Sequence, residues 1–315
     1  MNVALRPSAL QPGDTIGIAA PASAFKAELF ERAVAWLEVC GFQVKLAPGI
    51  FERHHYLAGK ASTRVDDLHM LFADPDVKAI FCARGGYGSM QLLPHLDYDL
   101  SAANPKIFVG YSDLTPLLGA IRDRCGLVSY HGPVMTGLAG LTDDDSKAHL
   151  LAALSGWQMP PAALSARQSL VGGVAVAEAI GGNLTMMAAA LGTPYQLETR
   201  GRILLVEEVG ERPFRVDRVL TQLRLAGVFD EVAGVAVGTM IGCHESGGGG
   251  RPTDDLLIEN LSTLSVPVCI GLPFGHGAAN RLLPIGTPLC LDGDLGTLSF
   301  SQPLVSPPAE SVGVS

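Results

Sequence analysis

The 315-residue sequence lacks a long uninterrupted apolar run, although nearly half of its residues are hydrophobic. Gly, Pro or a charged residue interrupts every apolar stretch well before the roughly 18 residues needed to cross a bilayer. The first residues place one Arg and then Pro-Gly-Asp ahead of any apolar run, which is the wrong order for a secretory signal peptide. We therefore expect a soluble, cytoplasmic protein with no membrane partner.

Clusters of basic residues are also missing. The formal net charge is -9, and Lys and Arg are scattered, so the chain lacks the positive surface that phosphate backbones require. Nucleic acid is therefore not expected as a partner. The six cysteines form no CxxC pair and lie mostly within apolar segments, which is typical of buried thiols. HExxH and paired Cys/His spacings are absent, so no metal site is predicted.

The first half of the chain alternates short β-rich runs with helical ones. TIGIAA, FQVKLA, VKAIFCA and KIFVGY read as strands, and helices are predicted over 27–40 and 62–72. This βαβ rhythm indicates an α/β fold with a parallel sheet covered on both faces. Ligands bind such sheets beyond the carboxyl ends of the strands, which here read AAPAS, ARGGYGS and GYSDLT.

The length predicts two domains. We expect an α/β domain over 1–155, a Pro-, Ala- and Ser-rich linker over 156–171 and a β-rich domain over 172–305. The tail over 306–315 and the glycine run from Gly247 to Gly250 are expected to be flexible.

Ser112 follows the apolar run KIFVG directly and precedes a helical segment. A sharp strand-to-helix turn exposes a hydroxyl, and a helix N-terminus offers free N–H groups to an oxyanion, so the position suits a nucleophile. Leu114 stands where the last glycine of a full GxSxG motif would be. The alternative is that Ser112 only caps the helix, because Ser is a preferred N-cap residue.

The segment ARGGYGS places glycines just after a strand. Gly85 and Gly86 allow backbone N–H groups to approach a ligand closely, and Arg84 can attract a substrate carboxylate. An ordinary tight turn is the competing interpretation. GxGxxG is absent here and no Walker A motif occurs, which disfavours a dinucleotide or nucleotide site.

An acid and a base are available for a serine nucleophile. Glu207 and Glu208 end the run RILLVEE, and the two-residue period of a strand points them to opposite faces, so only one can serve a site. Acids at strand ends are otherwise solvated. Among the histidines, His276 lies between glycines in FGHGA, while His131 and His244 remain rivals from their local context.

Together these segments resemble the LD-carboxypeptidase family. The matching strings are ARGGYGS, NPKIFVGYSDLT, GLVSYHGP, GGNLTMMAAALGTP, ILLVEEVGERPFRVDRVLTQL and IGLPFGHGAANRLLPIG, in order over nearly the whole chain. The resemblance implies a Rossmann-like or flavodoxin-like N-terminal domain and a β-rich C-terminal domain, with the site between them. It places the family's nucleophile on Ser112, its acid on Glu207 and its histidine on His276.

The same resemblance implies what the site would do. For a serine nucleophile we expect the backbone N–H groups of Gly86 and Asp113 to bind the oxyanion and Arg84 to receive the terminal carboxylate. The substrate would be murein tetrapeptide, which loses its terminal D-alanine, with no metal or organic cofactor and with a homodimer as the expected assembly. The alternatives are a peptidyl-nucleotide antibiotic of the microcin C type as substrate, a non-catalytic ligand-binding module, and an ordinary α/β-hydrolase esterase.

Overall fold

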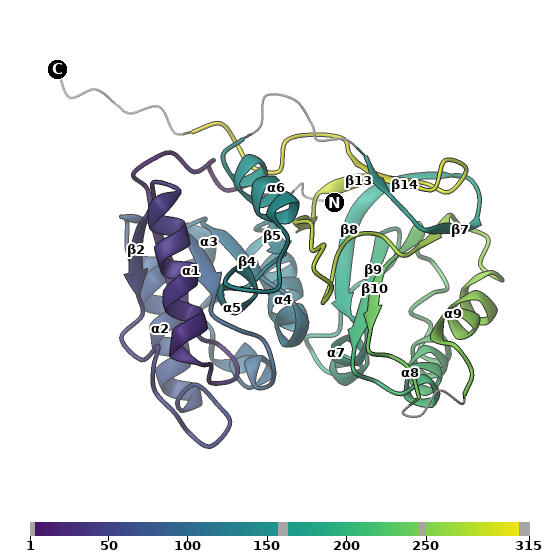
Figure 1. Ribbon diagram of the computed structural model, residues 1–315, viewed down its shortest axis with the longest axis horizontal. Coiled ribbons are helices and arrows are strands. Elements are labelled where there is room, and N and C mark those ends of the chain that lie inside the picture. The colour runs from purple at the N-terminus through teal and green to yellow at the C-terminus, as the bar shows by residue number, and fades with distance from the viewer. Residues whose placement is uncertain (1–3, 157–162, 246–249, 309–315) are drawn as a thin grey trace.

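The computed structural model describes residues 4–156, 163–245 and 250–308, folded into two units that lie side by side (Figure 1). The strands are β1 Thr15–Ala19, β2 Gln43–Leu46, β3 Val77–Cys82, β4 Ile107–Gly110, β5 Ser129–His131, β6 Leu164–Ser165, β7 Gln168–Val171, β8 Val174–Asn183, β9 Ile203–Val209, β10 Gly234–Ile241, β11 Val268–Ile270, β12 Leu283–Ile285, β13 Pro288–Asp292 and β14 Thr297–Phe300. The α-helices are α1 Ala27–Val39, α2 Ala61–Ala73, α3 Tyr98–Ala103, α4 Thr115–Cys125, α5 Met135–Leu138, α6 Asp144–Leu154, α7 Leu184–Ala190, α8 Pro213–Leu225 and α9 Thr253–Leu261, and the short 3₁₀ helices are η1 Ser89–Gln91, η2 Leu93–His95 and η3 Ser112–Leu114.

The first sheet has the strand order β12-β5-β4-β3-β1-β2. Strands β1 to β5 run parallel in the flavodoxin-like order β2-β1-β3-β4-β5, in which β2 and β3 lie on opposite sides of β1. In β3 every residue except Lys78 is buried, as expected for a strand with helices on both faces. Helix α1 buries Phe30, Ala33 and Leu37, which share one helical face. The predicted α/β class and parallel-sheet domain are confirmed.

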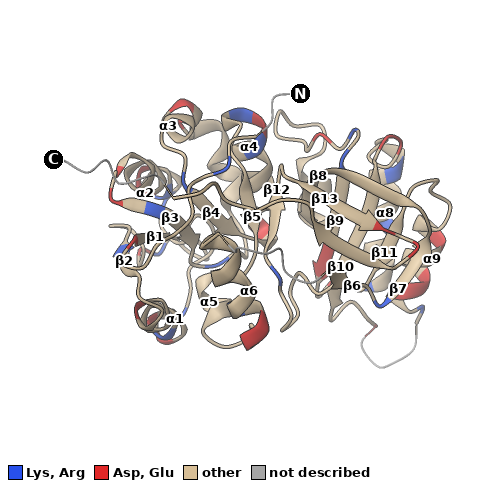
Figure 2. Cartoon of the chain, turned by 90° about the horizontal axis from the view of Figure 1, so that it is seen from above, with Lys and Arg blue, Asp and Glu red and all other residues tan. Residues whose placement is uncertain are grey.

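The second sheet has the strand order β6-β14-β13-β8-β9-β10-β11-β7. Its centre, β8 to β11, is parallel, and antiparallel strands flank it on both sides. The long strand β8 pairs with β13 through residues 174–178 and with β9 through residues 179–183, so it joins both parts of the sheet. The predicted β-rich second domain is confirmed. Positions coloured for charge lie mainly on helices and connecting segments (Figure 2).

Several segments depart from the predicted division of the chain. The linker prediction over 156–171 is wrong for 164–171, because β6 and β7 form the two edges of the second sheet; residues 157–162 lie outside the described part. The expected flexible tail is wrong at Ser306, whose backbone N–H donates to Pro7 and whose carbonyl accepts from Ala9. Residues 246–249 of the glycine-rich loop and 309–315 of the tail lie outside the described residues.

The two units are joined by more than the chain crossing between them. Strand β12, which belongs to the second half of the sequence, pairs antiparallel with β5 of the first sheet. Arg122 of α4 lies within 2.5 Å of Glu178 of β8, and both side chains are mostly buried. The Tyr130 hydroxyl of β5 donates to the carbonyl of Leu304 at 2.8 Å. The second half of the chain is therefore attached to the first unit by a strand pairing, an ion pair and a hydrogen bond.

Candidate active site

Ser112 occupies a strained turn between β4 and α4. Its φ is +67°, in the left-handed region that side chains other than glycine rarely adopt, as in a nucleophile elbow. Gly85 makes this turn possible, because a Cβ there would lie 2.9 Å from the Ser112 Cβ. Ser112 caps no helix, and α4 begins at Thr115, whose hydroxyl donates to the Ser112 carbonyl at 2.8 Å. The capping interpretation of Ser112 is therefore wrong.

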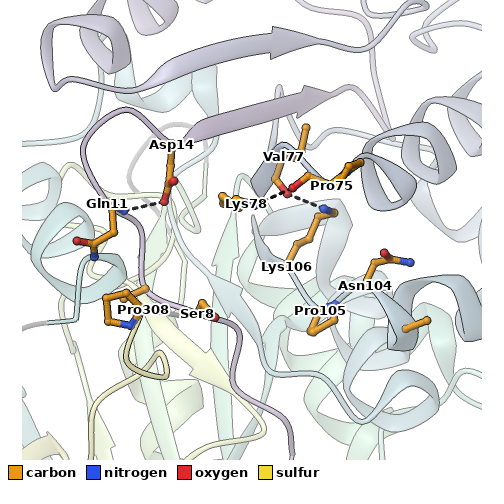
Figure 3. Close-up of a pocket in the computed structure, with 12 residues that line it drawn as sticks. Ser8, Gln11, Asp14, Pro75, Val77, Lys78, Asn104, Pro105, Lys106 and Pro308 are labelled. Carbon is orange, nitrogen blue, oxygen red and sulfur yellow. Dashed lines mark hydrogen bonds between the residues drawn. The ribbon is translucent and has the colours of Figure 1, made fainter. Parts of the chain in front are cut away.

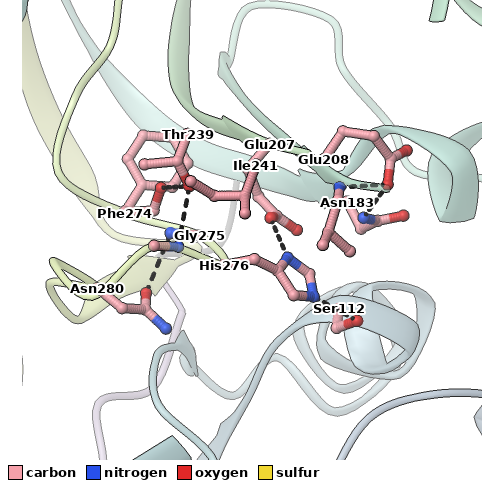
Figure 4. Close-up of polar contacts among 12 residues, drawn as sticks. Ser112, Asn183, Glu207, Glu208, Thr239, Ile241, Phe274, Gly275, His276 and Asn280 are labelled. Atoms are coloured by element: carbon pink, nitrogen blue, oxygen red, sulfur yellow. Dashed lines mark hydrogen bonds and ion pairs between the residues drawn. The ribbon is translucent and has the colours of Figure 1, made fainter. Parts of the chain in front are cut away.

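His276 lies between Ser112 and Glu207 (Figure 4). Its Nε2 is 2.9 Å from Ser112 Oγ, and its Nδ1 is 2.5 Å from Glu207 Oε2. With the ring proton on Nδ1, the imidazole donates to Glu207 and accepts from the Ser112 hydroxyl. Glu207 is fully buried in β9, so its carboxylate faces an environment of low dielectric in which a charge-assisted hydrogen bond is strong.

Glu208 points to the opposite side of β9 and has a different set of partners. Its carboxylate accepts from the Asn183 side chain at 2.8 Å and from both the N–H and the hydroxyl of Thr185, at 2.8 and 2.6 Å. These contacts fix the start of α7. Both acids are buried, so the expectation that acids at a strand end are solvated fails here. As predicted, Glu207 and Glu208 point to opposite faces of the strand.

The loop that carries His276 is fixed from both units. Gly275 has a φ of +105°, and a Cβ there would lie 2.8 Å from Glu207, so this position requires glycine. The Thr239 hydroxyl of β10 accepts from the Gly277 N–H at 3.2 Å. Asn280 accepts from the Gly275 N–H at 3.1 Å, and its own N–H donates to the Ser146 hydroxyl of α6 at 2.9 Å. A first-unit helix thus holds the histidine loop.

Four aromatic rings in tilted and edge-to-face contact form a stack at the site. The Tyr111 ring lies 4.7 Å from His276 and 5.7 Å from His131, and His131 lies 5.7 Å from Phe274, measured between centroids. Tyr111 and His131 come from the first unit, whereas Phe274 and His276 come from one loop of the second. The stack therefore fixes the His276 ring across the boundary between the units. His131, a rival for the base, is fully buried and forms no described contact with Ser112.

Burial shifts the pKa values of two of these rings, those of His131 and Tyr111. It lowers the pKa of His131 to about 3, with a further contribution from nearby His276. Burial also raises the pKa of the Tyr111 hydroxyl, as does the charge of Glu207. Both rings are therefore neutral near pH 7. Neither ring nitrogen of His131 has a hydrogen-bond partner among the described residues. His244, the other rival, is exposed.

A cleft of about 320 Å³ opens over Ser112. Its lining residues are Arg84, Gly85, Gly86, Tyr111, Ser112, Val134, Thr136, Val209 and His276. Gly86 lies in the cleft wall, whereas Asp113 contributes no lining surface. The Asp113 side chain is buried and accepts from the Ser89 N–H at 2.9 Å, which ties the glycine loop to the nucleophile turn. Burial raises the pKa of this carboxyl, opposed by its hydrogen bonds from Ser89.

A second cavity of about 410 Å³ lies at the opposite end of the first sheet, where β3 and β4 begin (Figure 3). Its buried cation, Lys106, donates to the carbonyls of Asp74 and Val77 at 2.6 and 2.5 Å. Burial, followed by the charge of Lys78, lowers the pKa of this lysine to about 8. Lys106 therefore links the segment before β4 to the start of β3.

The described residues contain no group of three or more His, Cys, Asp or Glu side chains arranged to hold a metal ion. Within the same ranges, every helix is too short or too polar to cross a bilayer.

The chain matches two known protein-family domains. Residues 16–132 match the LD-carboxypeptidase N-terminal domain, and residues 176–291 match the LD-carboxypeptidase C-terminal domain. The chain belongs to the LD-carboxypeptidase family. The family resemblance of the sequence motifs is thus confirmed, and the two matched regions correspond to the two units of the structure.

Individual relatives of this LD-carboxypeptidase cover almost all of the chain. The murein tetrapeptide carboxypeptidase of Pseudomonas aeruginosa is 36% identical over 299 residues, which cover 90% of this chain and 95% of that protein. The microcin C7 self-immunity protein MccF of Escherichia coli is 29% identical over 333 residues, covering 94% and 96%. A wild-type MccF structure in the apo state superposes with a TM-score of 0.87 at 27% identity, covering 96% of this chain and 100% of that one. The muramoyltetrapeptide carboxypeptidase from Oxalobacter formigenes gives a TM-score of 0.82 at 28% identity, covering 94% and 100%.

The structure also adds residues that the sequence analysis missed. Thr239 and Asn280 orient the histidine loop, and Tyr111 and Phe274 pack around His131. Tyr111 stands next to Ser112, and Asn280 stands four residues after His276, so proximity in sequence offered a signal for both. Thr239 lies 37 residues before His276, and nothing in its local sequence GTMIG indicates a contact with that loop.

Replacing His131 by Phe is expected to reduce the sensitivity of the fold to acid. The imidazole has a pKa of about 3 in the folded chain and about 6.5 when exposed. Between these values the unfolded chain binds a proton that the folded chain does not, so stability is complete above pH 6.5 and falls as the pH drops toward 3.

The variant keeps a ring in the stack but loses this proton, which contributes up to about 1.4 kcal/mol per pH unit. Urea unfolding of both proteins between neutral pH and about pH 4 measures the difference. Identical pH slopes for wild type and His131→Phe would contradict a neutral buried imidazole.

Proposed function

We propose that this LD-carboxypeptidase is a serine peptidase that releases the terminal D-alanine from murein tetrapeptide. The observation that carries the proposal is the hydrogen-bonded chain from Ser112 through His276 to Glu207 at the floor of a cleft. This arrangement supplies what a serine nucleophile needs, namely a base within hydrogen-bond reach and a carboxylate that orients the base. The relatives named for murein tetrapeptide and muramoyltetrapeptide support the substrate.

The reaction begins with acylation of Ser112. Its Oγ attacks the carbonyl carbon that links the L-centre of the diamino acid to D-alanine, while Nε2 of His276 takes the hydroxyl proton. Glu207 stabilises the imidazolium that forms and keeps the ring in the required tautomer. The tetrahedral intermediate then collapses, His276 returns the proton to the leaving nitrogen, the C–N bond breaks and D-alanine departs with a free amine.

Hydrolysis of the acyl-enzyme completes the cycle. A water molecule takes the place of the leaving group, and His276 removes a proton from it as its oxygen attacks the ester carbon. Collapse of the second tetrahedral intermediate breaks the bond to Ser112 Oγ, which regains its proton from His276. The products are D-alanine and a tripeptide with a new terminal carboxylate, and no group in the site is consumed.

Backbone N–H groups are proposed to bind the oxyanion. We assign this role to Gly86, which has a φ of +104° and lies in the cleft wall, and to Asp113, whose N–H follows the nucleophile directly. The buried contact of the Asp113 carboxylate with Ser89 supports the assignment, because it holds the two backbone segments together before substrate arrives. Such preorganised donors typically contribute about 10²- to 10³-fold in rate.

Arg84 is the proposed receptor for the terminal carboxylate. Among the described residues that line the cleft it is the only Lys or Arg, and no described carboxylate pairs with it. One guanidinium nitrogen donates to the carbonyl of Ala24 at 3.1 Å, which leaves other N–H groups for a ligand.

A second candidate substrate is a peptidyl nucleotide. The likeness to MccF, with a TM-score of 0.87, favours it. The same acylation and hydrolysis would apply, with the amine of the nucleotide part as the leaving group. We place this reaction second because the P. aeruginosa murein tetrapeptide carboxypeptidase is 36% identical to this chain and MccF is 29% identical. We further propose that the enzyme acts in the cytoplasm and forms a homodimer. Light scattering after gel filtration measures the mass of the assembly and thereby tests the homodimer.

Wild-type protein is expected to release D-alanine from muramyl tetrapeptide, with or without a chelator, and Ser112→Ala is expected to lose at least about 10³-fold in rate. Mass spectrometry of the free amino acid measures the release. The variant should unfold at the same urea concentration as wild type, because the hydroxyl fills no core space. Equal D-alanine release by both proteins would refute the role of Ser112.

The neighbouring acids offer a matched pair of variants. Glu207→Gln should lower kcat by roughly 10²- to 10⁴-fold, because an amide neither selects the tautomer nor stabilises the imidazolium. Glu208→Gln should leave kcat within a few fold and reduce stability by about 1–3 kcal/mol, because it disturbs the hydrogen bonds to Asn183 and Thr185. Steady-state kinetics and urea unfolding of both variants test this. Equal losses of kcat would contradict the assignment of the acid.

Arg84→Gln is expected to raise KM for the tetrapeptide roughly 10- to 100-fold, with kcat little changed, because a charge-assisted hydrogen bond is lost. A tetrapeptide that ends in a carboxamide provides the control. Wild type should show the same rise in KM on this analogue, and the variant should show no further rise. A variant that still discriminates fully between carboxylate and carboxamide would exclude Arg84 as the receptor.

A further inference from the structure

The segment GGN at the end of β8 takes no direct part in the reaction described above. Gly181 and Gly182 both have a positive φ, of +117° and +144°, which favours glycine. A Cβ on Gly181 would lie 2.3 Å from the carbonyl oxygen of Leu205 in β9, and one on Gly182 would lie 2.7 Å from the Thr115 hydroxyl. The two glycines therefore allow β8 of the second unit to come close to Thr115, which stands three residues after Ser112.

This close approach places the Thr115 hydroxyl between backbone groups of the two units. It accepts from the Asn183 N–H at 3.0 Å and donates to the Ser112 carbonyl at 2.8 Å. Thr115 is fully buried and Asn183 is 4% exposed, so both contacts are shielded from solvent. A hydroxyl has one proton to donate, and the Asn183 N–H occupies an acceptor position on its oxygen. The second unit thereby fixes the rotation of a hydroxyl that bonds to the backbone of the nucleophile.

A threonine near a helix start commonly donates to the carbonyl three or four residues earlier, with no further consequence. Two features distinguish Thr115 from that ordinary case. Its hydroxyl also accepts a hydrogen bond from the other unit, and the carbonyl that it contacts belongs to Ser112, whose φ is +67°. Strained backbone of this kind persists only where its surroundings hold it. The Thr115 hydroxyl is therefore part of what holds the nucleophile turn.

The carbonyl of Ser112 belongs to the same peptide group as the N–H of Asp113. This carbonyl accepts from both the hydroxyl and the backbone N–H of Thr115, so two donors fix its direction. A peptide group is planar and trans, so the Asp113 N–H points the opposite way from the carbonyl. Thr115 is buried and does not line the cleft, so the carbonyl points toward the interior. The contacts of Thr115 thus set the direction of the Asp113 N–H.

The same contacts strengthen this N–H as a hydrogen-bond donor. Hydrogen bonds in a chain polarise one another in a low-dielectric interior, and a peptide group whose oxygen accepts two of them has a more polar N–H. Here the chain runs from Asn183 through the Thr115 hydroxyl to the peptide group that contains the Asp113 N–H. The proposed function, on which this inference rests, assigns that N–H to the oxyanion. Both its direction and its strength depend on one threonine hydroxyl.

We propose that Thr115 is a positioning residue for the oxyanion-binding N–H of Asp113, and that the GGN segment of β8 holds its hydroxyl in place. Thr115 does not line the cleft, so it acts on the reaction through the peptide group after Ser112. The second unit therefore contacts the nucleophile twice, at its side chain through His276 and at its backbone through Thr115. Docking of the two units completes the oxyanion site as well as the triad.

Thr115→Val removes the hydroxyl and keeps the shape of the side chain. We expect kcat on muramyl tetrapeptide to fall about 10- to 100-fold with KM unchanged, because a misdirected donor weakens binding of the charged tetrahedral intermediate and not of the substrate. The pH dependence of kcat/KM should keep its wild-type midpoint, because His276 and Glu207 are untouched. Thr115→Ser restores the hydroxyl and should restore most of the wild-type kcat.

Thr287→Val is the matched control. Thr287 is 1% exposed, and its hydroxyl has no hydrogen-bond partner among the described residues, so this variant should keep the wild-type kcat and KM. Urea unfolding of each variant establishes that the kinetics are measured on folded protein. If Thr115→Val does not fold, Thr115→Ser and Thr115→Ala make the same comparison, because they differ by one hydroxyl.

Labelling by a fluorophosphonate tests the oxyanion site without the tetrapeptide. Ser112 Oγ attacks the phosphorus, His276 takes the hydroxyl proton, fluoride leaves as the O–P bond forms, and the phosphoryl oxygen occupies the oxyanion site. The labelling rate, followed by mass spectrometry of the intact protein, should fall in Thr115→Val by about the same factor as kcat. It should recover in Thr115→Ser.

Three results would overturn the proposal: wild-type kcat and labelling in Thr115→Val, equal losses in Thr115→Val and Thr115→Ser, or a loss that appears in KM or in the pH midpoint. If wild type released no D-alanine, the proposed function would fail, while the labelling rates would still decide the role of Thr115. A wild type that is neither active nor labelled would refute both, because Ser112 would then not be a nucleophile.

Discussion

The hydrogen bond between Ser112 Oγ and His276 Nε2 is the contact on which the rest of the structure depends. It measures 2.9 Å and joins residues 164 positions apart, one in each unit. A hydrogen bond of this kind weakens steeply beyond about 3.2 Å, so the two units must be held in place to within a few tenths of an ångström. The pairing of β12 with β5, the Asn280–Ser146 bond and the ring stack around Tyr111 all act on this one distance.

The site combines strain with burial, and each needs support from its surroundings. The left-handed backbone of Ser112 costs on the order of 1–3 kcal/mol and persists only because Gly85 leaves room for it. Glu207 is fully buried, and one of its carboxylate oxygens has no hydrogen-bond partner among the described residues. Its hydrogen bond to His276 therefore offsets part of the free-energy cost of removing this carboxylate from water. A site made in this way is rigid before substrate arrives.

Local signals predicted much of the fold but only part of the site. The βαβ rhythm indicated the parallel sheet, and the strand-to-helix junction singled out Ser112, because both are properties of short segments. Spacing alone left Glu208 beside Glu207 and His131 beside His276, since contacts over 69 and 164 residues leave no trace in local sequence. The strands β6 and β7 were missed for a related reason: edge strands of two and four residues take their conformation from the strands they join.

The buried and the exposed parts of the molecule differ in how readily their side chains can be replaced. Ser112, Glu207 and His276 are joined by hydrogen bonds within and between the two units, so any change in this core would disturb the distances between the three side chains. The loops after β1, β2 and β3 instead carry exposed side chains such as Tyr56 and Tyr87, which can change without loss of packing. Differences in substrate among proteins of this fold are therefore expected to arise in exposed loops of this kind, while the buried contacts between the two sheets are retained.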